Sequence, residues 1–133
     1  MVSPERRAQA GWLEARLRSF PHAFRGLGRL LREPNARIHA AAALSVLGAA
    51  YFLRVTPLEW AALILTILVV FAAEAFNTAL ESLADAAVPE RHPLVGTAKD
   101  LAAAGVLIAA LGAIAIGCLV LGPHLWDLSG TPR

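Results

Sequence analysis

Apolar and polar positions form two different patterns along the chain. Between Trp12 and Leu31 the apolar residues recur at steps of three and four with arginines between them, and long apolar segments follow at about 37–53, 58–88 and 97–121. The first pattern predicts an amphipathic helix over about 12–31, which Pro21 should kink or divide. The later segments are long enough to cross a bilayer as helices. The expected fold is therefore an all-α membrane protein with an N-terminal surface helix and three transmembrane helices.

Turn-forming residues mark the ends of these segments. A disordered lead is expected at 1–11, and an unstructured tail at 123–133, because Gly122-Pro123 should end the third span. Thr97 is expected to cap the start of that span. Residues 12–122 then form a single membrane domain. Gly105 and Gly117 belong to a stripe of small residues on the third span, which allows another helix to approach closely.

Composition and charge place this domain in a membrane and orient it. The chain is 57% hydrophobic and only 17% charged, which excludes an ordinary soluble domain. Eight of the 12 basic residues precede the first span, so the positive-inside rule puts the N-terminus and the second connecting loop in the cytoplasm. A basic amphipathic helix is typical of a segment on an anionic membrane surface, although a soluble partner-binding helix has the same pattern.

The second span carries polar residues that an apolar helix normally avoids. Glu74, Asn77, Glu81 and Asp85 stand at i, i+3, i+7 and i+11, so on a helix they occupy one stripe roughly 80° wide. Charged groups at membrane depth are kept facing a bundle interior, a water-filled cavity or a cation. We interpret the stripe as a divalent cation site with one carboxylate left over as a base. For Asp85 the alternative is a solvated helix end.

Further polar residues gather at the same cytoplasmic side. The whole set suits phosphoryl transfer, because carboxylates hold magnesium, a lysine neutralises phosphate charge and a buried carboxylate accepts a proton. It comprises Glu33, Glu74, Asn77, Glu81, Asp85, Glu90, His92, Lys99 and Asp100. No Walker-type phosphate loop accompanies it. The rival interpretation is a small cation- or proton-coupled transporter, in which Glu74 and Glu81 bind the ion.

Two motifs resemble those of the small prokaryotic diacylglycerol kinase and undecaprenol kinase family of membrane lipid kinases. The segment 74–81 matches the family's Glu-x-x-Asn-(Ser/Thr)-Ala-(Ile/Leu)-Glu signature, and Ala98-Lys99-Asp100 matches a second motif. The resemblance covers roughly 19–121. The enterobacterial type has Arg where this chain has Thr97. The segments 33–39 and 92–94 resemble the branch common in Gram-positive bacteria, whose characterised members prefer undecaprenol.

The resemblance implies a role for each matched residue. Glu74 would be the catalytic base that takes the proton of the lipid hydroxyl, and Glu33 and Glu81 would carry Mg²⁺ with ATP. The nucleotide-binding set would be Glu33, Asn77, Glu81, Asp85, Glu90, His92, Lys99 and Asp100. Glu74 and Arg37 are the candidate contacts to the lipid substrate.

The resemblance also implies an activity and an assembly. The expected reaction transfers the γ-phosphate of ATP to undecaprenol or to diacylglycerol in a bacterial inner membrane, with the active site on the cytoplasmic side. The family resemblance implies a homotrimer with active sites shared between neighbours. Three short spans enclose little volume, which agrees with a cavity built by several copies. No nucleic-acid partner is expected.

Overall fold

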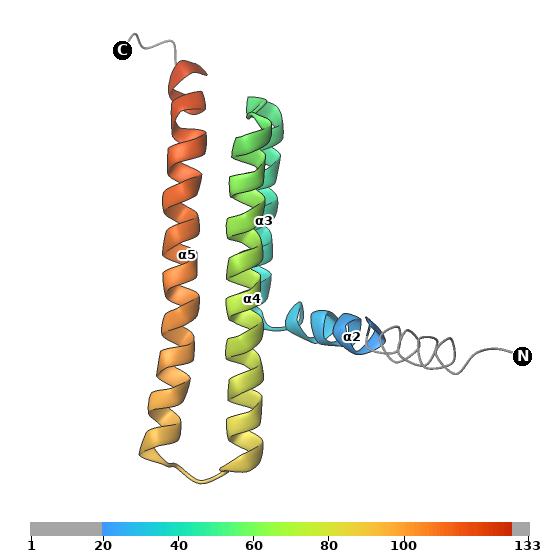
Figure 1. Ribbon diagram of the computed structural model, residues 1–133, viewed down its shortest axis with the longest axis vertical. Helices are drawn as coiled ribbons and strands as arrows, with labels where there is room; N and C mark the ends of the chain where they lie inside the picture. Colours follow the sequence, from blue (N-terminus) through green and yellow to red (C-terminus); the bar gives the residue numbers. More distant parts are fainter. Residues whose placement is uncertain (1–19, 129–133) are drawn as a thin grey trace, which may run out of the picture.

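The structure is a computed structural model that describes residues 20–128, and its regular elements in that range are helices. Three of them are long and apolar enough to cross a membrane: α3 (Pro34–Leu53), α4 (Pro57–Ala87) and α5 (Pro93–Leu128). They run side by side along the long axis of the molecule (Figure 1). This arrangement confirms the predicted all-α membrane fold. The lead expected at 1–11 lies outside the described residues.

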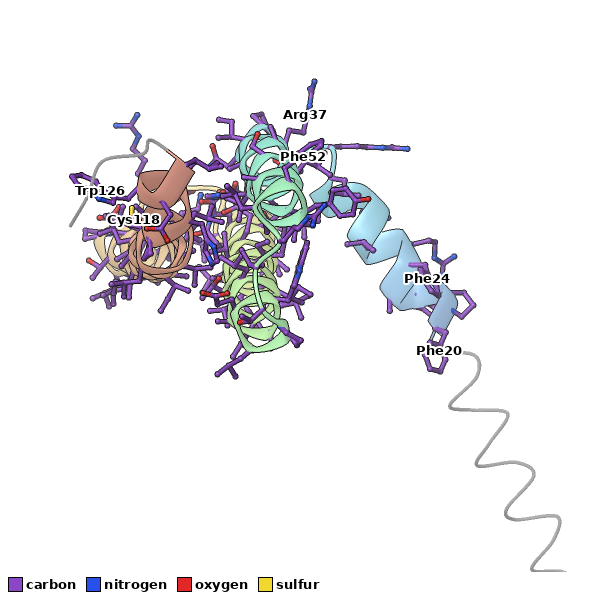
Figure 2. All side chains as sticks on the ribbon, turned by 90° about the horizontal axis from the view of Figure 1, so that it is seen from above. Phe20, Phe24, Arg37, Phe52, Cys118 and Trp126 are labelled. Atoms are coloured by element: carbon purple, nitrogen blue, oxygen red, sulfur yellow. The ribbon has the colours of Figure 1, made fainter. Side chains whose placement is uncertain are left out.

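Helix α2 (Phe20–Leu30) projects sideways from the three long helices (Figure 1). Phe20 and Phe24 are exposed on it and lie away from the other helices (Figure 2), whereas Leu30, at its end, is buried. The opposite face carries Arg25 and Arg29, which are exposed. A helix with one apolar and one basic face is suited to lie on a membrane surface, as the sequence predicts. Pro21 is the second residue of α2, and the part of the surface helix expected before Phe20 falls outside the described residues.

The α3–α4 turn is fixed by two adjoining caps. Arg54 ends α3 in the left-handed conformation (φ 54°, ψ 45°), and the N–H of Val55 donates to the carbonyl of Ala50 at 3.3 Å. Thr56 then begins α4 with a capping box, because its side chain accepts from the N–H of Glu59 while the Glu59 carboxylate accepts from the N–H of Thr56. We call this side of the molecule the turn end.

The most continuous core lies near the turn end. It consists of buried Ala50, Val55, Leu63 and Val120, with Trp60 among the partly buried residues packed against them. Other large apolar side chains, such as Phe52 and Leu58, are 82% exposed. Such exposure fits helices whose outer surfaces face lipid or further copies of the chain.

The opposite side, which we call the loop end, is the α4–α5 loop at residues 88–92 together with the helix turns beside it. Helix α3 has 20 residues, and Asn77 stands 20 residues after Pro57, the first residue of α4. Because α3 and α4 are antiparallel, the start of α3 is about level with Asn77. The rest of α4 and the first turns of α5 therefore extend beyond α2 and α3, as Figure 1 shows.

Several predicted boundaries of the spans are wrong. The first span begins at Pro34 rather than near Arg37, with Glu33 as its N-cap. Helix α5 begins at Pro93, because proline is favoured in the first turn, so Thr97 is not a cap: its hydroxyl donates to the Pro93 carbonyl at 3.1 Å inside the helix.

The expected end of the third span is also wrong, since α5 continues through Pro123 to Leu128. Proline removes one backbone donor, which membrane helices tolerate. Only residues 129–133 of the expected tail lie outside the described part.

Candidate functional site

The polar stripe of α4 runs from a buried to an exposed environment. Glu74 is 2% exposed and Asn77 is 6% exposed, the two buried polar residues of the described chain. Glu81, one turn further, is half-buried, and Asp85 is exposed near the end of the helix. The predicted stripe therefore enters the span at Glu74 and continues into the part of α4 that extends beyond α3.

Glu74 and Asn77 keep unused hydrogen-bonding capacity in this buried position. Oε2 of Glu74 and Oδ1 of Asn77 are buried and lack a hydrogen-bond partner among the described residues. Asn77 donates through Nδ2 to Oε1 of Glu81 at 3.1 Å, which orients the Glu81 carboxylate. A buried polar atom without a partner is costly and rare in folded proteins. These two oxygens are therefore placed to receive a proton, a hydroxyl or a cation.

Lys99 joins the stripe from α5. Its Nζ lies 2.5 Å from Oδ1 of Asp85, and the two side chains are 32% and 71% exposed. This ion pair links α4 to α5 at the loop end. It also confirms that Lys99 and the acidic stripe, which are far apart in the sequence, share one side of the molecule.

The other predicted site residues are not joined to this group by a recorded side-chain contact. Glu33 is exposed at the start of α3 and makes no side-chain capping bond. Arg37 is exposed and extends away from α4 and α5 (Figure 2). The remaining three, Glu90, His92 and Asp100, are exposed at the loop end. The predicted roles of all these residues stay predictions.

The oxygen atoms of the stripe fit only a metal site that substrate phosphates complete. Within residues 20–128, no three His, Cys, Asp or Glu side chains are grouped to hold a metal ion. Mg²⁺ does not require such a cage, because it is usually bound by one or two carboxylates together with substrate phosphates. Glu81, held by Asn77, offers a carboxylate of this type. The predicted pairing of Glu33 with Glu81 at the metal stays a prediction.

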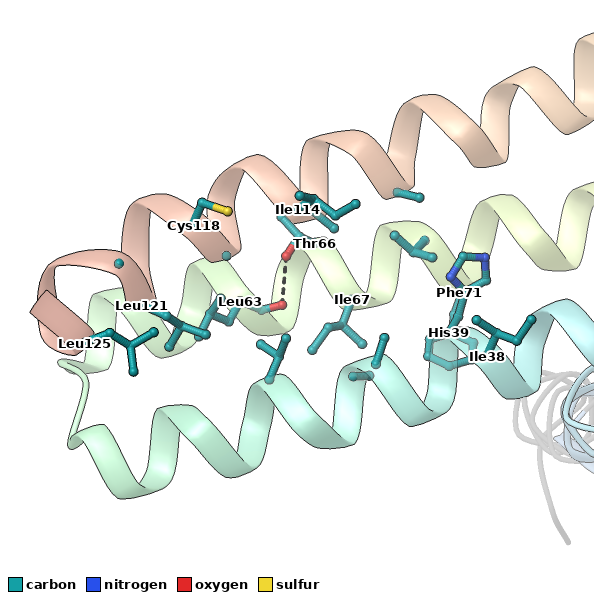
Figure 3. A pocket seen from close by; sticks show the side chains of 18 residues that line it. Ile38, His39, Leu63, Thr66, Ile67, Phe71, Ile114, Cys118, Leu121 and Leu125 are labelled. Atoms are coloured by element: carbon teal, nitrogen blue, oxygen red, sulfur yellow. Dashed lines mark hydrogen bonds between the residues drawn. The ribbon is translucent and has the colours of Figure 1, made fainter.

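An apolar groove lies between the three spans, with a volume of about 670 Å³ (Figure 3). It extends from Ile38, His39 and Phe71 toward Leu121 and Leu125 at the turn end. The hydroxyl of Thr66 in its wall donates to the backbone carbonyl of Leu63 at 2.9 Å, so it is satisfied inside α4. Val70 and Phe71 line the groove, and Glu74 follows them about one helical turn later. Glu74 itself does not line the groove, which therefore ends about one helical turn before the buried carboxylate.

Sequence reasoning did not identify this groove or the polar cluster at the turn end. There, Nε2 of His124 lies 3.2 Å from Oε1 of Glu59, and both side chains are about one-third exposed. Thr56 followed by Glu59 is a readable capping signal. No local pattern shows that a histidine near the end of α5 meets that carboxylate, because the two residues are 65 positions apart.

Known proteins are similar in sequence to this chain over most of its length. The family model described as prokaryotic diacylglycerol kinase matches residues 21–121. The chain is 38% identical to the undecaprenol kinase of Bacillus subtilis over 109 residues, which are 81% of this chain and 89% of that protein. It is 33% identical to the diacylglycerol kinase of Escherichia coli over 94 residues, 71% of this chain and 77% of that protein.

A longer relative is similar as well. The chain is 40% identical to the diacylglycerol kinase of Synechocystis over 110 residues, which cover 80% of this chain but only 63% of that protein. The family match includes α3, α4 and most of α5, and with them the buried stripe and the ion pair. This chain belongs to the prokaryotic diacylglycerol kinase family.

Proposed function

We propose that the protein transfers the γ-phosphate of ATP to the hydroxyl of a membrane lipid. The observation that carries this proposal is Glu74: a carboxylate buried inside a membrane span, with one oxygen unpartnered, about one turn beyond the end of an apolar groove. A lipid lying in the groove would bring its hydroxyl to that oxygen. Family membership supports the same reaction class, since the named relatives are lipid kinases.

Glu74 is proposed as the general base. Its unpartnered Oε2 would accept the proton of the lipid hydroxyl as that oxygen attacks phosphorus. Burial keeps bulk water from this position, which protects the phosphoryl group from hydrolysis. Arg37 is a weaker candidate for a lipid contact within the same chain, because its side chain extends away from α4.

The nucleotide would bind at the loop end, where polar groups are within reach of water. Bound Mg²⁺, held by Glu81 and Glu33, would neutralise the negative charge of the phosphates. Asn77 orients Glu81 through its 3.1 Å hydrogen bond, and Lys99 supplies the ammonium for the phosphates. The rest of the proposed nucleotide site is drawn from Glu90, His92 and Asp100, and Asp85 borders it through its pair with Lys99.

Undecaprenol is the acceptor that the groove suits best. Apart from His39, Thr66 and Cys118, the side chains that line the groove are hydrocarbon or glycine, and the Thr66 hydroxyl is already bonded to the backbone. A polyprenol has a single polar group at one end, whereas diacylglycerol brings two ester groups that need hydrogen-bond partners. The relative from Bacillus subtilis is named undecaprenol kinase, which agrees with this choice.

The protein is proposed to act in a bacterial inner membrane with the loop end in the cytoplasm, where ATP is available. The concentration of arginines before the first span supports this orientation. We also propose a homotrimer. Phe76, about level with the start of α3, is 78% exposed, and Leu83, on the part of α4 that extends beyond α2 and α3, is 69% exposed. At its position Leu83 needs cover other than acyl chains. Gly105 leaves open space there, since a Cβ at this position would meet nothing within 4 Å.

The direct test is phosphate transfer in mixed micelles. Purified protein is offered γ-labelled ATP with undecaprenol and diacylglycerol side by side, with and without Mg²⁺. We expect labelled undecaprenyl phosphate as the main product, formed only with the divalent ion. Labelled phosphatidic acid alone would overturn the choice of acceptor. No labelled lipid from folded protein would overturn the proposed reaction.

A further inference from the structure

Lys99 occupies an unusual position in the charge distribution of the loop end. It is the single lysine of the whole chain. In the described part of this end, four carboxylates belong to Glu81, Asp85, Glu90 and Asp100, whereas the permanent cations are Lys99 and Arg91. One of those cations is already engaged, because the Lys99 ammonium lies 2.5 Å from the Asp85 carboxylate. A nucleotide phosphate arriving here therefore meets an excess of negative charge.

The ion pair can open at little cost. Asp85 is 71% exposed, and a pair with such an exposed partner contributes little to stability because water solvates the freed carboxylate well. Lys99 is only 32% exposed and carries its ammonium on a flexible stem, so it can turn from one anion to another. Phosphate oxygens are strong acceptors for such an ammonium.

We propose that Asp85 occupies the place of a nucleotide phosphate on Lys99 in the nucleotide-free protein, and that the ammonium passes from Asp85 to the phosphate when Mg²⁺-nucleotide binds. This inference rests on the proposed kinase function and assigns Asp85 a positioning role that acts through Lys99. Asp85 keeps the Lys99 side chain extended and oriented next to the stripe, and it competes with the phosphate for the same ammonium. Its net effect is to raise the nucleotide concentration needed for half-saturation.

The single lysine makes the exchange directly observable. Protein labelled with ¹⁵N at the lysine side chain gives one ammonium signal, that of Lys99, in an NMR spectrum recorded in micelles. We expect this signal to differ between wild type and Asp85→Asn without nucleotide, and to coincide when both are saturated with Mg²⁺ and a non-hydrolysable ATP analogue. A difference that persists in the saturated proteins would show that the pair does not open, and would overturn the inference.

Kinetics give a second readout. Asp85→Asn removes the competitor, so the KM for Mg²⁺-ATP should fall about two- to fivefold, the range expected for an exposed ion pair. Asp85→Glu, which can still pair with Lys99, should restore the higher KM. Asp127→Asn at the turn end removes the same charge far from the site and serves as the matched control. A rise in KM for Asp85→Asn would mean that Asp85 itself holds the nucleotide, and would overturn the inference.

The two proposals fail differently. If the wild-type protein phosphorylates lipid but its Lys99 signal does not move with nucleotide, the exchange is wrong and the kinase proposal stands. If no lipid is phosphorylated and no nucleotide moves the signal, both are wrong.

Discussion

The proposed chemistry centres on one residue, Glu74. A buried carboxylate with an unpartnered oxygen is unfavourable for stability, because burial removes the group from water without a compensating hydrogen bond. Such a group is retained where the reaction uses it. Stability and activity are therefore expected to respond in opposite ways when the negative charge is removed.

Glu74→Gln tests this opposition. Glutamine has nearly the same shape but accepts no proton, so turnover should fall by about 10²- to 10⁴-fold, the contribution of a general base. The thermal midpoint in micelles should stay equal or rise, since the buried carboxylate is gone. Glu74→Asp keeps the carboxylate one methylene further away, and should retain more activity than the Gln variant. Activity of Glu74→Gln within tenfold of wild type would show that another group is the base.

Asn77 illustrates what the sequence predicts about a site residue and what it leaves out. Its spacing from Glu81 is sufficient to predict that the two side chains lie on one helix face, because the spacing alone fixes that geometry. Its burial depends on how α4 packs against the other helices. Local pattern does not contain that information.

For the helices, too, the sequence predicts some features and leaves others out. Long apolar runs predict three spans correctly, because hydrophobic length is set by the bilayer and can be counted in the sequence. The predicted helix end at Gly122-Pro123 is wrong, because glycine and proline end a helix less readily inside a membrane than in water. Helix α5 continues to Leu128. That extension matters, since it carries His124 to the start of α4.

The contact between His124 and Glu59 links the end of α5 to the start of α4 at the turn end. His124→Ala removes one partner and leaves the Glu59 carboxylate with its Thr56 bonds alone. We expect the thermal midpoint in micelles to fall by a few degrees, the size typical of a partly exposed pair. The chemistry at the loop end should be little affected, because the pair lies at the opposite end of the groove.

A double-mutant cycle isolates this contact from the other bonds of Glu59. Glu59→Gln, His124→Ala and the combined variant are compared by thermal unfolding. If the effects of the two single changes simply add, the two side chains do not interact in the folded protein, and the inference that their contact stabilises it is wrong.

At the scale of the whole molecule, one chain looks incomplete as an enzyme. Glu33 stands exposed at the start of α3, the stripe lies on α4, and no side-chain hydrogen bond or ion pair joins Glu33 to the stripe among the described residues. Exposed Phe76, about level with the start of α3, and Leu83, on the extending part of α4, offer a surface that a second copy would cover. A site assembled from neighbouring copies accounts for both observations.

Mixing two inactive variants distinguishes a shared site from a complete one. Glu33→Ala and Glu74→Gln each lack one required carboxylate, so each should be inactive alone. If Glu33 and Glu74 of one site come from different copies, random mixing at equal amounts leaves both residues intact in about a quarter of sites, and activity should return to that fraction. A mixture of Glu74→Ala with Glu74→Gln is the control, since no copy supplies the base. Failure of the first mixture to recover, in assemblies that demonstrably exchange chains, would place both carboxylates of each site on one chain.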